Sequence, residues 1–357
     1  MPAELQRTRC VNIDWLNVAF LEPIGKPLTF EYFKREGLNV VSRGYGTPVF
    51  AEVLLIKQNS MPFLEIRRNP YSKKGQGGIF SPRLCHIRLD NRACYLEDPI
   101  NELRKFVLAY HYEYVGISRV DICCDFNRFD TGADPAKFIL KYMRAEISKI
   151  NQCNLAAHGK DNWTGRTFNS LKWGSESSLI TTKLYNKTLE MQQAKEKPYI
   201  IAAWKDAGLD LTKPVWRIEF SIRAEGRHVV STDGEYIELG LTTIDARRKL
   251  WVLFAGLSRK YFHFKHVEFV GDKPKRKDRC KDVELFRYTA DIPVYSPKRL
   301  NGRQAPDRTD RILLRRLQRY QDEAAWCKGR DWQAITDTIA YMKHHYDFEL
   351  TLATAVQ

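Results

Sequence analysis

The sequence predicts an α+β fold, with a largely antiparallel central sheet, helices packed on one face and a small C-terminal helical hairpin. Three observations predict it: strands joined by short turns, two helices with the same start signal, and strict polar–apolar alternation along the later strands. The length of 357 residues allows one large domain with an appendage. We expect a main domain over 1–270, a basic linker or arm over 271–305 and a helical accessory region over 306–357.

Strand signals dominate the first hundred residues. The predicted strands are Val11–Phe20, Val49–Gln58, Pro62–Arg68, Leu84–Leu89 and Ala93–Leu96. A hairpin-like turn over 58–61 joins the second strand to the third, and a turn about Asp90-Asn91 joins the last two. Strands joined this tightly pair antiparallel.

Two predicted helices share one start signal. Asp98-Pro99 and Asp134-Pro135 each precede apolar residues at helical spacing. In both, the aspartate caps free N–H groups and the proline occupies a position that needs none. The strand Gly116–Phe126 lies between them. Later strands are expected at Thr167–Trp173, Ser178–Asn186 and Val215–Arg223, and helices from about Thr188 to Lys195 and from Thr243 to Lys260.

The composition becomes basic and polar after Gly271. Apolar residues at helical spacing then predict a helix over Thr309–Trp326 and another after Asp331. Arginines form a stripe along the first of these, and such a stripe can follow a phosphate backbone. The alternative is a solvated helix face. The residues we expect to bind DNA here are Lys273, Lys275, Arg276, Lys277, Arg308, Arg311, Arg315 and Arg319.

The overall charge favours a polyanionic partner. Lys and Arg number 58 against 43 Asp and Glu, a formal net charge of +15, which attracts nucleic acid first and anionic membranes second. No apolar run approaches the ~20 residues that span a bilayer, and the N-terminus lacks a signal-peptide pattern. We therefore expect a cytoplasmic protein without a membrane partner. Eight scattered cysteines without a C-x-x-C pair are expected to be reduced and mostly buried.

Three predicted strands carry polar side chains of the kinds that act in catalysis or bind metal ions. Along 118–126, alternation places Arg119, Asp121 and Asp125 on one face. Along 216–223 it places Arg217 and Glu219 together on the face opposite the apolar residues. Alternation of this kind predicts antiparallel strands with one solvent-exposed face. The two aspartates would lie about 13 Å apart along an ideal strand, so only one of them is expected to bind a given ion directly.

The third strand, 180–187, places Lys183, Tyr185 and Lys187 on one face, with Glu190 just inside the next helix. Carboxylates hold hard divalent ions such as Mg²⁺ or Mn²⁺, and the ion polarises a phosphate oxygen. Because a free phenol has a pKa of about 10, we expect the lysines and the metal to lower the pKa of Tyr185. The set is typical of phosphoryl transfer, in which a tyrosine attacks a DNA phosphate and leaves a phosphotyrosine and a 3′-OH.

Four short motifs occur in a fixed order. They are Arg119-Val120-Asp121 with Asp125, Gly174-Ser175 before Ser178, Tyr185-Asn186-Lys187 with Glu190, and Arg217-Ile218-Glu219. In this order they resemble the replication initiation factor family, which includes rolling-circle initiators of plasmids and phages and related relaxases of conjugative elements. Ile13-Asp14-Trp15-Leu16 resembles its opening strand. The resemblance covers about Ile13 to Arg223.

The resemblance implies sequence-specific nicking and strand transfer at an origin through a 5′-phosphotyrosine, which initiates rolling-circle replication. It implies Tyr185 as the nucleophile, assisted by Lys183 and Lys187, and Mg²⁺ or Mn²⁺ on acidic ligands. The implied ligands are Asp121, Asp125 and Glu219, supported by Glu190, Arg119 and Arg217. Residues 1–270 would then form the nicking domain. Origin DNA, with duplex and a locally single-stranded nick site, is the expected partner, and a host helicase and a second copy of the chain are candidates.

Other classes of protein fit parts of the pattern. A relaxase for mobilisation begins with the same nick, and an origin-binding regulator without activity, or an initiator that has lost nicking, would use the same basic surface. Tyr346 after His344-His345 resembles a tyrosine recombinase, but this strand-rich chain does not supply the helical catalytic domain of that class.

Overall fold

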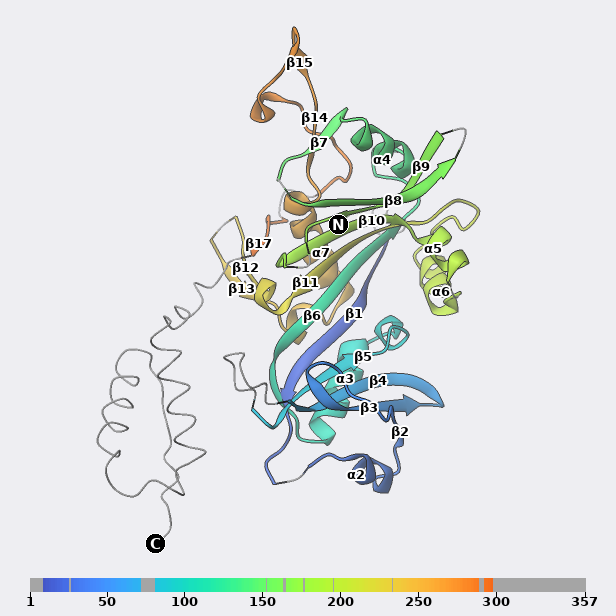
Figure 1. Cartoon of the computed structure of the whole chain (residues 1–357), viewed down its shortest axis with the longest axis vertical. Helices are drawn as coiled ribbons and strands as arrows, with labels where there is room; N and C mark the ends of the chain where they lie inside the picture. Colours follow the sequence, from blue (N-terminus) through green and yellow to red (C-terminus); the bar gives the residue numbers. More distant parts are fainter. Residues whose placement is uncertain are drawn as a thin grey trace, which may run out of the picture. The chain divides into compact units, whose positions relative to one another are not determined.

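A ten-stranded antiparallel sheet forms the centre of the structure, a computed structural model that describes residues 9–297 except 26, 72–80, 152, 163–164, 176, 195, 233 and 289–291 (Figure 1). The strand order is β2-β3-β4-β5-β1-β6-β11-β10-β9-β8. The strands are β1 Cys10–Leu21, β2 Asn39–Ser42, β3 Phe50–Gln58, β4 Met61–Pro70, β5 Leu84–Leu89, β6 Glu113–Phe126, β8 Leu155–Asn162, β9 Gly165–Trp173, β10 Ile180–Asn186 and β11 Trp216–Arg223. The predicted α+β class with an antiparallel sheet is confirmed.

Short turns explain the outer half of the sheet. β3 and β4 are joined at Asn59 and Ser60, which both adopt positive φ angles of 50° and 61°. Paired positive φ angles twist a two-residue turn in the sense that antiparallel strands require. The strand predicted at Ala93–Leu96 is wrong: Ala93–Tyr95 forms a single 3-10 turn, η1. Its residues Ala93 and Cys94 are buried in the core rather than paired with β5.

The helices are α2 Phe30–Arg35, α3 Pro99–Ala109, α4 Pro135–Met143, α5 Lys187–Gln193, α6 Pro198–Asp206 and α7 Arg247–Tyr261. The two predicted start signals are confirmed. Asp98 accepts a hydrogen bond from the backbone N–H of Asn101 at 3.1 Å, and Asp134 accepts one from Ala136 at 2.8 Å. Each cap satisfies N–H groups that have no partner within the helix.

The main hydrophobic core lies on one face of the sheet. Even-numbered residues of β6 and β11, such as Ile122 and Phe220, pack there with apolar side chains of α3, α4 and α7. The short helices α5 and α6 form a second, smaller cluster with Cys10 and Val215. The Trp204 indole of α6 bonds the side chain of Asp125, which points away from the main core, so α6 covers part of the opposite face.

The segment after Gly271 continues the main unit. Leu285, Phe286 and Tyr295 are buried in the same core as the sheet, whereas residues 271–279 are exposed. The predicted helical region 306–357 lies outside the described residues. The remaining elements are β7 Ile147–Lys149, β12 His228–Val230, β13 Tyr236–Glu238, β14 Phe264–His266, β15 Phe269–Val270, β16 Lys273–Pro274, β17 Ser296–Pro297, η2 Ala224–Arg227, η3 Leu241–Thr243 and η4 Lys277–Arg279.

Two expectations about composition can be checked in the described part of the chain. The cysteines described there are all free thiols, and only Cys153 of them is exposed. Within the same residues, none of the helices combines the length and the apolar character needed to cross a lipid bilayer.

Candidate active site

The polar face of β6, β11 and β10 brings the predicted residues together. Glu219 lies opposite Lys183 in the register, and Ser221 lies opposite Asp121. The alternation predicted for these strands is therefore present. The solvent exposure expected for this face is absent, because Asp121, Arg217 and Glu219 are only 3%, 0% and 4% exposed. These groups are buried because they pair with one another and because α6 and η1 cover part of the face.

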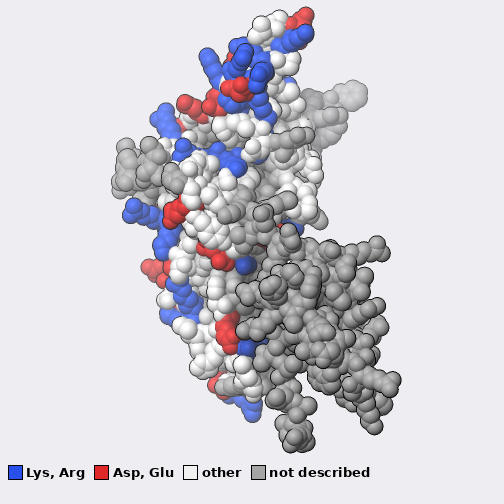
Figure 2. All heavy atoms as spheres, turned by 90° about the vertical axis from the view of Figure 1, so that its left-hand side faces the viewer, with Lys and Arg blue, Asp and Glu red and all other residues white. Residues whose placement is uncertain are grey.

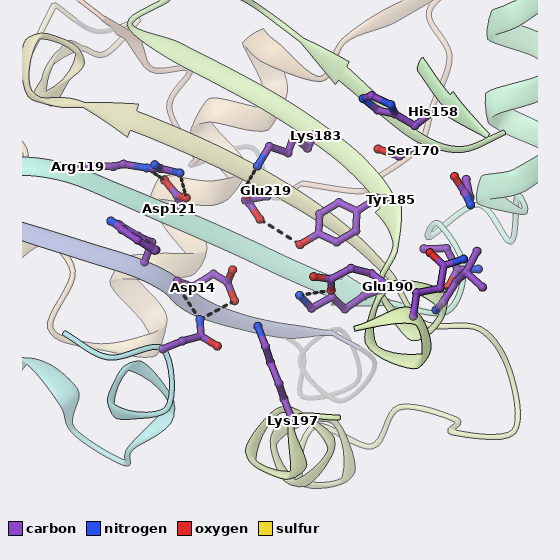
Figure 3. Close-up of a pocket in the computed structure, with 17 residues that line it drawn as sticks. Asp14, Arg119, Asp121, His158, Ser170, Lys183, Tyr185, Glu190, Lys197 and Glu219 are labelled. Atoms are coloured by element: carbon purple, nitrogen blue, oxygen red, sulfur yellow. Dashed lines mark hydrogen bonds and ion pairs between the residues drawn. The ribbon is translucent and has the colours of Figure 1, made fainter. Parts of the chain in front are cut away.

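A cleft of about 550 Å³ opens on this face (Figure 3). Residues of β1, β6, β10 and β11 form its floor, and α5 and Lys197, the residue before α6, contribute one side. The side chains that line it include Asp14, Trp15, Arg119, Asp121, His158, Ser170, Lys183, Tyr185, Lys187, Glu190, Lys197 and Glu219. Apart from Asp125 and Arg217, the cleft gathers every site residue predicted from the β6, β10, α5 and β11 segments.

Tyr185 and Lys183 share one carboxylate. The Tyr185 hydroxyl donates a hydrogen bond to Glu219 Oε2 at 3.1 Å, and Lys183 Nζ contacts Glu219 Oε1 at 2.7 Å. Figure 3 shows both groups pointing at Glu219 from the neighbouring strand. Burial favours the neutral amine, but the charge of Glu219 outweighs it and raises the pKa of Lys183. The hydroxyl therefore faces a base that can accept its proton, next to a fixed positive charge.

The pKa of Tyr185 lies well above the ordinary value, which contradicts the expected lowering by lysine. Burial of the phenol is the main cause, and the negative charge of Glu219 adds to it. Lys187 Nζ does lie 5.4 Å from the centre of the Tyr185 ring, but it forms an ion pair with Glu190 at 2.5 Å. The positive charges of both lysines are thus directed at carboxylates, and Tyr185 in this state is a neutral hydrogen-bond donor.

Asp121 is held beside this group by two donors. The Arg119 guanidinium donates to both of its oxygens at 2.9 and 2.6 Å, and the Ser221 hydroxyl donates at 2.6 Å. Burial nevertheless raises the pKa of Asp121; the bond from Arg119 opposes this rise and the charge of Glu219 contributes to it. A buried carboxylate with a raised pKa beside a second carboxylate in a cleft is a candidate functional group.

We expect Asp121→Asn to abolish most activity and to lower stability less than Asp125→Asn does. The raised pKa means that ionised Asp121 costs the folded state free energy, a cost that disappears as the pH falls through the folded pKa and is present at pH 7. The amide removes that cost but leaves one of the donors around Asp121 without an acceptor. Thermal unfolding at pH 7 should therefore give a midpoint between those of the wild type and Asp125→Asn. A midpoint of Asp121→Asn below that of Asp125→Asn would contradict this reasoning.

Arg217 lies beneath the cleft and forms ion pairs with two aspartates. It donates to both oxygens of Asp125 at 2.6 and 2.7 Å and also contacts Asp14 and the Tyr95 hydroxyl. Trp204 Nε1 donates a third bond to Asp125 at 2.6 Å. Asp125 is fully buried and does not line the cleft. The structure therefore places Asp125 and Arg217 as a buried ion pair beneath the other predicted site residues, and not among them.

Asp14 is a cleft residue that the sequence patterns did not single out beyond its place in the opening strand. Its side chain accepts hydrogen bonds from Asn91 and Tyr95, in addition to Arg217. Burial opposes ionisation, but Arg217 and Lys187 outweigh it and lower the pKa of Asp14 below its usual range. The aspartate interrupts an apolar strand between Ile13 and Trp15. That signal in the sequence could have identified it.

Only some of the carboxylates that were expected to bind a metal ion lie where they could do so. Within the described residues, no three Asp, Glu, His or Cys side chains gather around one point that could hold an ion. Asp121 and Glu219 remain as two neighbouring carboxylates on the floor of the cleft. Mg²⁺ commonly takes one or two carboxylates from a protein and completes its shell with water and substrate phosphate. The residues present fit such a shared site, and Asp125 does not belong to it.

The basic residues predicted for DNA binding lie apart from the cleft. Lys273 lies in β16 and is followed by Lys275, Arg276 and Lys277, and all four are exposed. Figure 2 shows Lys and Arg side chains gathered at this end of the molecule, with some acidic ones between them. Lys275 pairs with Glu268 at 2.7 Å and Lys277 donates to the Ile150 carbonyl at 2.7 Å. The four arginines predicted at 308–319 lie outside the described residues.

An antiparallel sheet with a tyrosine hydroxyl on a carboxylate, flanked by lysine and arginine in a polar cleft, defines a candidate phosphoryl-transfer site. No family model matches the chain, and no curated protein does. Among solved structures, the chain is similar to a rolling circle replication initiator protein from Geobacillus stearothermophilus, with 18% identity, a TM-score of 0.46, and coverage of 78% of this chain and 93% of that one. That protein is of the class that the sequence motifs resemble.

Proposed function

We propose that the chain is a DNA nickase and strand transferase that initiates rolling-circle replication at an origin in the cytoplasm. The observation that carries the proposal is the hydrogen bond of 3.1 Å from the Tyr185 hydroxyl to Glu219. It pairs a nucleophile with a base in an open cleft that also presents Lys183 and Arg119 for a phosphate. The net charge of +15 supports DNA as the substrate.

The reaction follows from the contacts of Tyr185. Its Oη attacks a backbone phosphorus while its proton passes to Glu219 Oε2, which already accepts its hydrogen bond. The bond from phosphorus to the 3′ oxygen breaks, and that oxygen takes a proton from water to give a free 3′-OH. The 5′ phosphate remains on Tyr185. In the reverse direction a 3′-OH attacks the phosphotyrosine and gives its proton to water. The bond from phosphorus to the Tyr185 oxygen breaks, Glu219 returns the proton to that oxygen, and the strands are joined.

Positive charge in the cleft compensates the charge that develops on the phosphate. Lys183 and Arg119 lie on either side of the two carboxylates and can turn from them toward phosphate oxygens. A Mg²⁺ or Mn²⁺ ion held by Asp121 and Glu219 would polarise the phosphate and favour tyrosinate. Lys187 and Glu190 hold each other beside the phenol ring and fix the start of α5. Lys273, Lys275, Arg276 and Lys277, together with Arg308, Arg311, Arg315 and Arg319, would hold the flanking duplex.

Covalent capture of DNA tests the proposal. Incubation with supercoiled plasmid that carries the cognate origin should give nicked circles and a protein–DNA adduct that survives denaturation. Chelation should stop both, and added Mg²⁺ or Mn²⁺ should restore them, because Asp121 and Glu219 would otherwise repel the phosphate. Binding to the origin without any adduct would instead identify a regulator without nicking activity. Full nicking in excess chelator would remove the metal from the proposal.

A further inference from the structure

An arginine patch extends the polar face of the sheet beyond the cleft. We define it as Arg43, Arg67 and Arg88, which all contact the carboxylate of Glu65 at 2.8, 2.6 and 3.0 Å. Glu65 is 2% exposed, whereas the three arginine side chains remain partly accessible. Three guanidinium groups thus share one buried carboxylate, which leaves an excess of positive charge on this part of the face.

The excess is costly to the fold. Burial lowers the pKa of Arg88, the attraction of Glu65 opposes this, and repulsion from Arg67 and Arg43 adds to it. Arg88 Nε is buried and finds no hydrogen-bond acceptor within the described residues. Like charges packed around one acid destabilise a fold unless an anion compensates them. An anionic ligand would compensate this charge through the parts of the three guanidinium groups that remain accessible.

The patch is continuous with the cleft. Arg119, Asn17, Arg88 and Glu65 lie directly opposite one another across β6, β1, β5 and β4, a span of about 14 Å at ordinary strand spacing. The ring of Trp15 joins the two regions. It lines the cleft, and the guanidinium carbons of Arg88 and Arg119 lie 4.5 and 5.1 Å from its centre.

We infer that the arginine patch binds the single-stranded DNA that leads into the cleft. The inference rests on the proposed function for the identity of the strand. Guanidinium groups in a row can follow successive phosphates. Trp15 links the patch to the cleft through its contacts with Arg88 and Arg119. Because the reaction proposed for the cleft acts on one strand and the patch is continuous with the cleft, the strand that enters the cleft is the occupant that fits the patch.

The double substitution Arg43→Gln, Arg67→Gln tests the patch in the full chain. Arg88 stays to pair with Glu65, so the buried acid keeps a partner. Both this variant and its reference carry Tyr185→Phe, so that no strand is cleaved during the measurement. The probe is fluorescent oligothymidylate of about 16 nucleotides, compared with one of about 4 nucleotides that can fill only the cleft.

Affinity for the longer strand should fall, and its dependence on salt should become shallower by about 1.4 in log–log slope, about 0.7 for each phosphate that an arginine no longer neutralises. The short strand should change little. Lys137→Gln, Lys141→Gln on α4 removes the same charge from exposed positions on the core side of the sheet and should leave the slope unchanged.

An unchanged slope for the long strand, or a weakening confined to duplex DNA, would overturn the inference. Nicking of supercoiled origin DNA by the wild type is measured separately. If the wild type never nicks but the double substitution still weakens long-strand binding, the proposed function fails and the patch stands. If the wild type nicks and the salt slope of the double substitution is unchanged, the proposed function stands and the inference about the arginine patch fails.

Discussion

Tyr185→Phe should abolish both nicking and the covalent adduct while origin DNA still binds with nearly wild-type affinity. The substitution removes one oxygen, the atom that would bond phosphorus, and leaves the ring and its contact with Lys187 in place. The loss of the bond to Glu219 should cost the fold only about 1 kcal/mol. Gel analysis of supercoiled origin plasmid measures the nicking, and denaturing gels with labelled DNA measure the adduct.

A neighbouring tyrosine provides the control for this substitution. Tyr199 donates its hydroxyl to Asn91 at 2.6 Å and does not line the cleft. Tyr199→Phe removes the same atom from the same region and should leave nicking close to the wild-type rate. Peptide mapping of the adduct decides the assignment directly, and DNA found on any tyrosine other than Tyr185 would contradict it.

The sequence predicted correctly those structural features that depend on interactions between residues close together in the chain. Asp98-Pro99 and Asp134-Pro135 start helices because capping involves residues two or three positions apart. Alternation separated Asp121 and Glu219 from the core because a strand points successive side chains to opposite faces. Helix α6 was missed, and its role depends on Trp204, whose partner Asp125 lies far away in the sequence.

Long-range pairing explains what the sequence could not show. β6 lies between β1 and β11, which brings Asp14 of β1 within reach of Arg217 of β11, 203 residues later in the chain. The spacing of apolar residues along one strand does not show which distant strand will lie beside it. The same applies to Asp125: its place on the polar face was predictable, but its burial against Arg217 and Trp204 was not. Burial also raises the pKa of Tyr185, whereas the lysines were expected to lower it.

Glu219→Gln should lower the nicking rate by about 10²–10⁴-fold, the range for loss of a general base. The amide keeps the shape of the side chain and can still accept a hydrogen bond from Tyr185, but it cannot take the proton. DNA binding should stay close to that of the wild type, because the change removes one negative charge and frees Lys183 to meet phosphate, but also removes one ligand of the proposed ion. Single-turnover nicking measures the rate, and filter binding to the origin measures affinity.

Glu190→Gln is the matched control, since Glu190 also lines the cleft but contacts Lys187 and not the Tyr185 hydroxyl. It should cost far less activity than Glu219→Gln. The two variants should also differ in their response to pH. Burial keeps the pKa of Tyr185 well above its ordinary value, so without a base the reactive tyrosinate is scarce and its fraction grows about tenfold per pH unit below that pKa. The residual activity of Glu219→Gln should therefore climb steeply between pH 7 and about 9, whereas Glu190→Gln should follow the wild-type profile. A Glu219→Gln enzyme with the rate and pH profile of the wild type would show that the proton leaves Tyr185 by another route.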